Sequence, residues 1–276
     1  MSDNKQVDTT GHVWDDDLRE FNNPLPKWWL YTYYATIVFA VIYWVLYPAW
    51  PLVSDYTRGT LGWSQLGELK QEQEEAKVLQ GKYKEKLAGL AVADIMKDPE
   101  TRAFAVSTGK AIFGDKCAPC HGSAGQGKVG LFPNLTDDDW LYGGDAETIL
   151  ASINEGRQGM MPAQKGVLSD AQITNVTDYV LSMSGGQVDA ASAAAGKEVF
   201  AASCAMCHGE DGKGNPAMGA PNLADKIWLY GGDKENVLKT ITDGRSGLMP
   251  TFKAKLDAIE IKQVAVYVHQ LGGGQM

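Results

Sequence analysis

The sequence predicts an all-α protein with one N-terminal transmembrane helix followed by two tandem helical domains. Two observations predict this fold class. A long uncharged segment, residues 28–54, lies near the N-terminus. Farther along, one stretch of sequence occurs twice, and apolar residues recur at helical spacing in both copies. A repeat of about 80 residues has the size of a small domain and is too long for one turn of a solenoid.

The uncharged segment is long enough to cross a bilayer. As a helix, residues 29–50 would rise about 33 Å, and a hydrocarbon core is about 30 Å thick. Aromatic residues typical of the membrane–water interface crowd both ends, namely Trp28, Trp29, Tyr31, Tyr47 and Trp50. A cleaved signal peptide is disfavoured because the apolar run is long and lacks a small-residue cleavage site. A buried core helix is the alternative, but such a helix is rarely free of charge for so long. We therefore expect a transmembrane helix over residues 28–50, after a polar tail of residues 1–27.

The distribution of positive charge favours a cytoplasmic N-terminus. Lys5, Arg19 and Lys27 precede the span, whereas Arg58 alone follows it closely, and basic residues concentrate on the cytoplasmic side of membranes. Residues 51–104 are expected to form a partly helical connector, either a spacer or a surface for a partner subunit. The repeats would then lie across the membrane, as domains over residues 105–187 and 192–276.

Each repeat contains the motif C-x-x-C-H. The two copies comprise Cys117, Cys120 and His121, and Cys204, Cys207 and His208, and they account for all four cysteines of the chain. This motif is the attachment signature of c-type haem, in which both sulfurs form thioether bonds and the histidine binds the iron. A redox disulfide or a zinc site would not require a histidine directly after the second cysteine. We therefore predict two covalently bound haem c groups.

A second motif, G-x-M-P, follows each C-x-x-C-H at nearly the same distance and places Met161 and Met249 in matching positions. A thioether is a soft ligand that favours ferrous iron, so these methionines are candidates for the second axial position. The neighbouring Met160 aligns with Leu248, so we expect it to pack in the core. The spacing leaves open whether each methionine serves its own repeat or the other one.

An arginine precedes each methionine segment. Arg157 and Arg245 are either solvated surface residues or partners of a haem propionate, because a guanidinium group binds a carboxylate in a fork. The net charge of the chain is −9, and acidic residues outnumber basic ones within the repeats. This charge suits docking of a basic electron donor and argues against nucleic-acid binding.

These motifs resemble a known family. A helix running into C-x-x-C-H, then P-N-L, W-x-x-G-G and G-x-M-P, resembles class I cytochrome c domains over residues 105–186 and 192–274. The N-terminal sequences GHVWDDDLREFNNPLPKWWL, YPAWPL and SDYTRGTLGWS extend the resemblance to the dihaem subunit (subunit III) of bacterial cbb3-type cytochrome c oxidases. The resemblance implies a small all-α fold around each haem.

The resemblance also implies a function. A dihaem subunit of this family relays electrons from soluble cytochrome c or a bc complex to a monohaem subunit, and on to the catalytic subunit that reduces oxygen to water. It implies a bacterial inner membrane, haem domains in the periplasm, and crosswise ligation that pairs His121 with Met249 and His208 with Met161. We expect electrons to enter through the C-terminal repeat, where Glu210, Asp211 and Asp225 offer negative charge to a basic donor.

Two other functions stay open. A free-standing, membrane-anchored dihaem carrier serving other acceptors would carry the same haem groups. A dihaem peroxidase would need a haem with an exchangeable sixth ligand, whereas both repeats offer a methionine.

Overall fold

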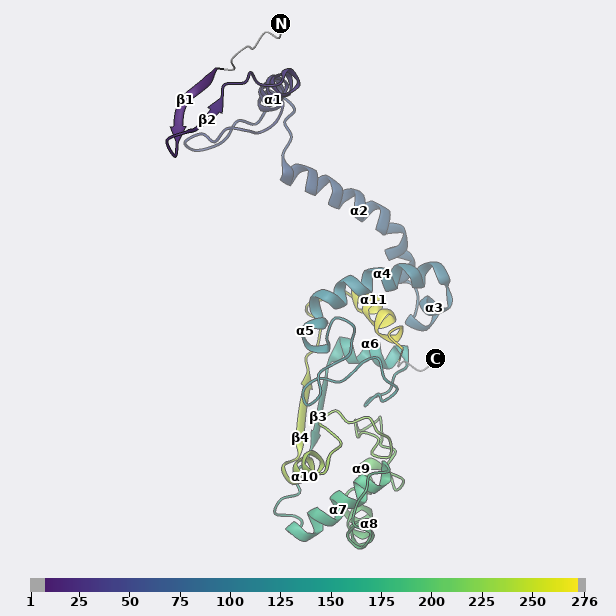
Figure 1. Ribbon diagram of the computed structural model, residues 1–276. Coiled ribbons are helices and arrows are strands. Elements are labelled where there is room, and N and C mark those ends of the chain that lie inside the picture. The colour runs from purple at the N-terminus through teal and green to yellow at the C-terminus, as the bar shows by residue number, and fades with distance from the viewer. Residues whose placement is uncertain (1–7, 273–276) are drawn as a thin grey trace. The chain divides into compact units, whose positions relative to one another are not determined.

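The computed structural model describes residues 8–272 and is mainly helical, as predicted (Figure 1). The chain forms two compact units that divide between Leu79 and Gln80. The first unit contains β1 (Thr9–Trp14), β2 (Leu18–Phe21), α1 (Lys27–Leu46) and most of α2 (Gln65–Ala88). The second continues with α3 (Val92–Lys97), α4 (Pro99–Lys116), α5 (Ala118–His121), α6 (Ala146–Glu155), β3 (Arg157–Met161), α7 (Asp170–Met183), α8 (Ala190–Ser203), α9 (Ala205–His208), α10 (Lys234–Asp243), β4 (Arg245–Met249) and α11 (Ala258–His269).

Within residues 8–272, α1 is the one helix long and apolar enough to cross a membrane. Its 20 residues would rise about 30 Å, and none of them is buried in the protein. The helix ends at Leu46, earlier than Trp50, because Pro48 cannot donate the next backbone hydrogen bond. The chain then folds back, and the N–H of Thr60 donates to the carbonyl of Val45 at 2.9 Å.

The tail before α1 forms a β-hairpin that the sequence analysis did not predict. β1 and β2 pair antiparallel, with Trp14 opposite Leu18 and Val13 opposite Arg19. The turn places Asp15 and Asp16 at φ values of 48° and 67°, a left-handed conformation that aspartate tolerates better than most residues. The sequence indicated this hairpin only weakly, because hairpin turns usually contain glycine or Asn-Gly.

The second unit contains two packing groups, which we call module A and module B. In module A, helices α3, α4, α6 and α11 share one apolar core. Its fully buried members include Leu87 from the end of the connector helix, Val92 and Ile95 from α3, and Phe113 from α4. In module B, α7, α8 and α10 share a second core around Val176, Phe200 and Ile241.

The modules do not coincide with the sequence repeats, because the repeats exchange their last helices. Helix α11 of the second repeat packs on α4 of the first, and α7 of the first repeat packs on α8 of the second. Glycine permits the same close crossing in both modules. A Cβ atom on Gly109 would overlap the carbonyl of Gln263, and one on Gly196 would overlap the carbonyl of Asn175.

A two-stranded ribbon joins the modules. β3 follows α6 of module A, β4 follows α10 of module B, and the two strands pair antiparallel (Figure 1). Gly159 lies opposite Gly247 at the centre, Arg157 lies opposite Met249, and Met161 lies opposite Arg245. The chain therefore crosses from each module into the other through this ribbon.

Candidate haem sites

The two C-x-x-C-H motifs adopt the same local structure. Cys117 follows the last turn of α4 and begins the single turn of α5, where the N–H of His121 donates to the carbonyl of Cys117 at 2.9 Å. The N–H of His208 donates to the carbonyl of Cys204 at 3.1 Å in module B. Cys117, Cys204 and Cys207 are partly buried, and Cys120 is exposed. The motifs therefore lie at the edges of the two cores, where one side of a bound group would meet solvent.

Each histidine is oriented by the P-N-L motif of its own repeat. Nδ1 of His121 lies 3.1 Å from the carbonyl oxygen of Pro133, and Nδ1 of His208 lies 3.1 Å from that of Pro221. A carbonyl can accept but not donate, so Nδ1 carries the proton and Nε2 keeps its lone pair for a metal. Burial lowers the pKa of both histidines, although these carbonyl contacts oppose the change. Neutral imidazole is the form that binds iron.

The candidate methionines lie on one face of the ribbon. Side chains of a strand alternate between faces, and directly opposed residues share a face. Met161 and Met249 are therefore on the same face, each opposite an arginine, with the glycine pair between them. The other face is solvent-exposed: Met160 is 79% exposed and Leu248 is 74% exposed. The prediction that Met160 packs in the core is wrong, because strand alternation turns it outward.

Each methionine packs in the module that carries the C-x-x-C-H motif of the other repeat. Met249 contacts the core of module A, which also holds Cys117, Leu135 and Trp140. Met161 contacts the core of module B, which also holds Cys204, Leu223 and Trp228. The ribbon thus brings each methionine into the core that carries the C-x-x-C-H of the other repeat. The matched spacing in the sequence could not reveal this exchange.

The arginines are held in matching positions. The guanidinium of Arg157 stacks on Tyr142, with 4.7 Å between Cζ and the ring centroid, and its Nε donates to Oγ of Ser152 at 2.8 Å. The guanidinium of Arg245 stacks on Tyr230 at 4.3 Å, and its Nη2 donates to Oγ1 of Thr240 at 2.7 Å. Both arginines are therefore fixed beside the methionine that lies opposite them in the ribbon.

Acidic residues of the two modules approach one another. Burial, and then the nearby carboxylates of Asp225 and Asp137, raise the pKa of Asp139 to about 6. Asp137 follows Leu135 of module A, and Asp225 follows Leu223 of module B, in matching loops. Asp211 forms an ion pair with Lys213 at 3.2 Å. Of the three acidic residues expected to face a donor, Asp225 thus lies near another carboxylate and Asp211 is already paired.

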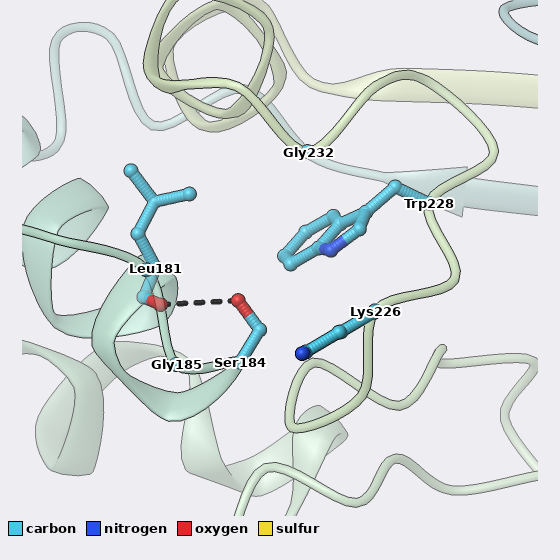
Figure 2. A pocket seen from close by; sticks show the side chains of 7 residues that line it. Leu181, Ser184, Gly185, Lys226, Trp228 and Gly232 are labelled. Carbon is cyan, nitrogen blue, oxygen red and sulfur yellow. Dashed lines mark hydrogen bonds between the residues drawn. The ribbon is translucent and has the colours of Figure 1, made fainter.

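A hollow of about 480 Å³ lies in module B, at the end of α7 (Figure 2). Leu181 and Trp228 supply apolar walls, and the amine of Lys226 points in beside Ser184. Its remaining lining residues are Gly185, Gly186 and Gly232. The lining includes neither the C-x-x-C-H residues nor Met161, so the hollow by itself adds no evidence for a haem site.

The donor set fits covalent haem at both motifs. Each module offers two thiols, a neutral histidine with a fixed Nδ1, and a methionine in the apolar core beside them. Within the part of the chain that the structure describes, no group of three or more His, Cys, Asp or Glu residues is placed to hold a metal ion. Fold and sites together define a membrane-anchored protein with c-type cytochrome domains.

Sequence comparisons identify the family. The family described as the N-terminal domain of cytochrome oxidase-cbb3, FixP, matches residues 6–54, and the family described as cytochrome c oxidase, cbb3-type, subunit III matches residues 104–180 and 191–268. The chain is 51% identical to the cbb3-type cytochrome c oxidase subunit FixP of Azorhizobium caulinodans, over 97% of this chain and 94% of that protein. It is 46% identical to the FixP subunit of a Bradyrhizobium strain over the whole of both chains. It is 45% identical to the CcoP subunit of Cereibacter sphaeroides, over 97% of this chain and 95% of that protein.

The chain belongs to the FixP/CcoP family of cbb3-type cytochrome c oxidase subunits. It is accordingly an electron-transfer subunit of an oxidase complex, it associates with other oxidase subunits, and its cytochrome c domains imply covalently bound haem c. The apolar helix α1 accounts for its association with the membrane.

Proposed function

We propose that the protein carries two haem c groups with crosswise axial ligands. Cys117 and Cys120 hold one haem, with His121 and Met249 as ligands. The second haem is held by Cys204 and Cys207, with His208 and Met161 as ligands. The observation that carries this proposal is the position of each methionine in the core beside the other repeat's C-x-x-C-H. When bound, haem c supplies an iron that accepts and returns one electron, and thioether ligation raises its potential.

The ribbon links the two proposed haem sites, because it carries both proposed methionine ligands. Met161 and Met249 share one ribbon face, and each lies at the far end of the paired segment from the other. Four residue steps along a strand correspond to about 13 Å. The two methionines therefore lie on the same face of one ribbon, about 13 Å apart along it.

Arg157 and Arg245 are proposed partners of the haem propionates. Each is stacked on a tyrosine and hydrogen-bonded to the preceding helix, so little side-chain entropy would be lost when it binds a carboxylate. Each also lies opposite the proposed methionine ligand of the same module. An arginine at this place would stabilise a nearby negative charge.

We propose that electrons enter at module B and leave from module A toward the membrane. Module A is the one to which the connector is joined by packing: Leu87 is fully buried in its core, and Tyr83 stacks on Phe104 with 4.8 Å between ring centroids. The proposed donor is a soluble cytochrome c or a bc complex. The proposed acceptors are the monohaem subunit and the catalytic subunit of a cbb3-type oxidase that reduces oxygen to water.

The proposed location is the inner membrane of a bacterium, with the N-terminus in the cytoplasm and both modules in the periplasm. Three basic residues before the span support this orientation. Attachment of haem c outside the inner membrane, which the family resemblance implies, supports it independently. Protease added to sealed spheroplasts should remove both modules while residues before α1 stay protected.

One experiment separates the relay from its alternatives. The full chain, purified from membranes in mild detergent, should bring the oxidase catalytic subunit with it and should barely bind carbon monoxide when reduced. Recovery without the catalytic subunit would favour a free-standing carrier. Strong carbon monoxide binding by the untreated protein would favour an open sixth position and hence a peroxidase.

A further inference from the structure

The β1–β2 hairpin exposes apolar side chains on both of its faces. Val13 and Phe21 lie on one face, because Val13 is opposite Arg19, two residues before Phe21. Trp14 and Leu18, which are directly opposed, lie on the other face. Leu18 and Phe21 are each 64% exposed, and Trp14 is 42% exposed. We call these four residues, Val13, Trp14, Leu18 and Phe21, the hairpin surface.

Such a hairpin needs a covering partner. A single two-stranded hairpin is at best marginally stable in water, and large exposed apolar side chains mark interaction sites. The hairpin ends at Phe21, and α1 begins at Lys27. Five residues span at most about 18 Å, so the hairpin must lie close to the membrane surface. Its partner is therefore either the lipid headgroups or the loops of a neighbouring membrane protein.

Charge decides between these partners. The turn carries Asp15, Asp16 and Asp17, Glu20 lies in β2 and Asp8 directly precedes β1. Arg19 is the one lysine or arginine between Thr9 and Phe21. A negatively charged hairpin is repelled by the anionic lipids of a cytoplasmic leaflet. Cytoplasmic loops of multi-span membrane proteins are instead rich in lysine and arginine. A flat lipid surface could also cover one face of the hairpin but not both.

We propose that the hairpin surface docks between basic cytoplasmic loops of a multi-span subunit of the oxidase. The apolar residues fill the space between the loops, and the aspartates of the turn pair with their lysine and arginine side chains. The hairpin thus adds a cytoplasmic contact to any contact made by α1 within the membrane. This inference rests on the proposed orientation, with the N-terminus in the cytoplasm.

The test uses the full chain with a C-terminal affinity tag, purified from detergent-solubilised membranes. The measured quantity is the catalytic subunit recovered per haem-stained chain. Two double variants, Trp14→Ser with Leu18→Ser and Val13→Ser with Phe21→Ser, remove one apolar face each. Each should lower recovery about tenfold, equivalent to ~1.4 kcal/mol. Val167→Ser, an exposed valine outside the hairpin, is the matched control and should recover normally.

A second variant tests the role of the negative charge of the hairpin and preserves the conformation of its turn. Asp15→Asn, Asp16→Asn and Asp17→Asn together keep residues that tolerate a positive φ but remove three charges. This variant should also lower recovery. Recovery with the unchanged chain should fall in about 0.5 M salt, and the variant should lack this sensitivity. Glu72→Gln, Glu74→Gln and Glu75→Gln in α2 remove the same charge elsewhere and serve as the control.

The outcomes distinguish this inference from the proposed function. If the unchanged chain fails to recover the catalytic subunit, the proposed relay is wrong. Should the unchanged chain recover it and the hairpin variants recover it equally well, the docking inference alone is overturned. Equal recovery together with weaker binding to anionic-lipid vesicles would identify lipid as the partner and would also overturn it.

Discussion

Modules A and B are built from matching sequence but are stabilised by different interactions. In module B, Asp178 of α7 is 1% exposed, and one of its oxygens lies 2.6 Å from Nζ of Lys234 at the start of α10. The aligned residues of module A are Val266 and Ala146, both buried. An ion pair in one module thus occupies the place of two buried apolar residues in the other.

Module A is stabilised by the connector instead. Nζ of Lys262 in α11 donates to the carbonyls of Leu87, Ala88 and Leu90, at 3.1, 3.1 and 2.7 Å. The aligned residue of module B is Thr174, which is exposed. The two repeats thus share the helix crossing and the haem motifs, whereas the ends of their helices differ. Module A became the attachment point of the connector, and module B is stabilised by its own ion pair.

The largest expected effect on stability comes from the close helix crossing that both modules share. Gly109→Ala and Gly196→Ala would each place a methyl group on a backbone carbonyl of the partner helix, so each should cost about 3 kcal/mol of the free energy of unfolding. Gly114→Ala is the control in α4, because no atom lies near its added Cβ. Thermal unfolding followed by circular dichroism measures the loss. Equal stability of Gly109→Ala and Gly114→Ala would contradict the close crossing.

The ion pair of module B gives the next largest effect. Asp178→Asn leaves Lys234 without its partner and should cost about 2 kcal/mol, because Lys234 is half exposed and keeps part of its hydration. Asp170→Asn, on the exposed part of the same helix, should change stability much less. Denaturant unfolding of the two variants at neutral pH makes the comparison.

The same pair predicts a pH dependence. Burial opposes ionisation of Asp178, but hydrogen bonds from Lys234 and Ser192 outweigh it and lower its pKa. A lowered pKa contributes stability above the ordinary aspartate value of about 3.9, and this contribution is lost as the pH falls below that value. The difference between wild type and Asp178→Asn should therefore shrink in acid. A difference that persists at low pH would show that the loss has another cause.

Removing the lysine that holds the connector should have a smaller effect. Lys262→Met removes the donor that the carbonyls of Leu87 and Ala88, at the end of α2, share with the carbonyl of Leu90, before α3, and should cost about 1.5 kcal/mol. Lys239→Met, at an exposed position of α10, is the control. Amide hydrogen exchange should speed up around residues 90–97 in Lys262→Met. Unchanged exchange there would refute the role of Lys262.

The smallest effect is expected between the modules. Because the pKa of Asp139 is raised to about 6, its ionisation destabilises the fold as the pH rises from about 4 through 6. Asp139→Asn should therefore stabilise the protein at pH 7, by less than about 1 kcal/mol because Asp139 is only partly buried and solvent screens its charge. Asp138→Asn, next to it and exposed, should give a smaller change. The melting temperatures of Asp139→Asn and the unchanged protein should be compared at pH 4 and pH 7. An equal rise in melting temperature at both pH values would contradict the raised pKa of Asp139.

Much of this molecule could be predicted from its sequence. Two C-x-x-C-H motifs, two G-x-M-P motifs and an uncharged span are local signals, and each indicates a local structure or chemistry by itself. The hydrogen bond from each histidine to a proline carbonyl was not predicted, although the repeated P-N-L was its signal.

The features that sequence analysis missed depend on partners far away in the chain. β3 and β4 are five-residue strands with glycine at their centres, and each is stable because it pairs with the other. The exchange of α7 and α11 between the repeats could not be predicted either, because the apolar face of each helix could pack on α4 or on α8. The matched spacing of the motifs leaves the pairing of methionines with histidines open, so the crosswise pairing that we propose rests on both of these facts and on the family resemblance.

Crosswise ligation is the central claim, and single-haem variants test it most directly. In the full chain with Cys204→Ser and Cys207→Ser, the haem on Cys117 and Cys120 remains. We predict that adding Met249→Leu to this chain lowers the midpoint potential and abolishes the sulfur-to-iron charge-transfer absorption, whereas adding Met161→Leu leaves both unchanged. The opposite result, with loss on Met161→Leu and none on Met249→Leu, would show that each methionine serves its own repeat and would contradict the account.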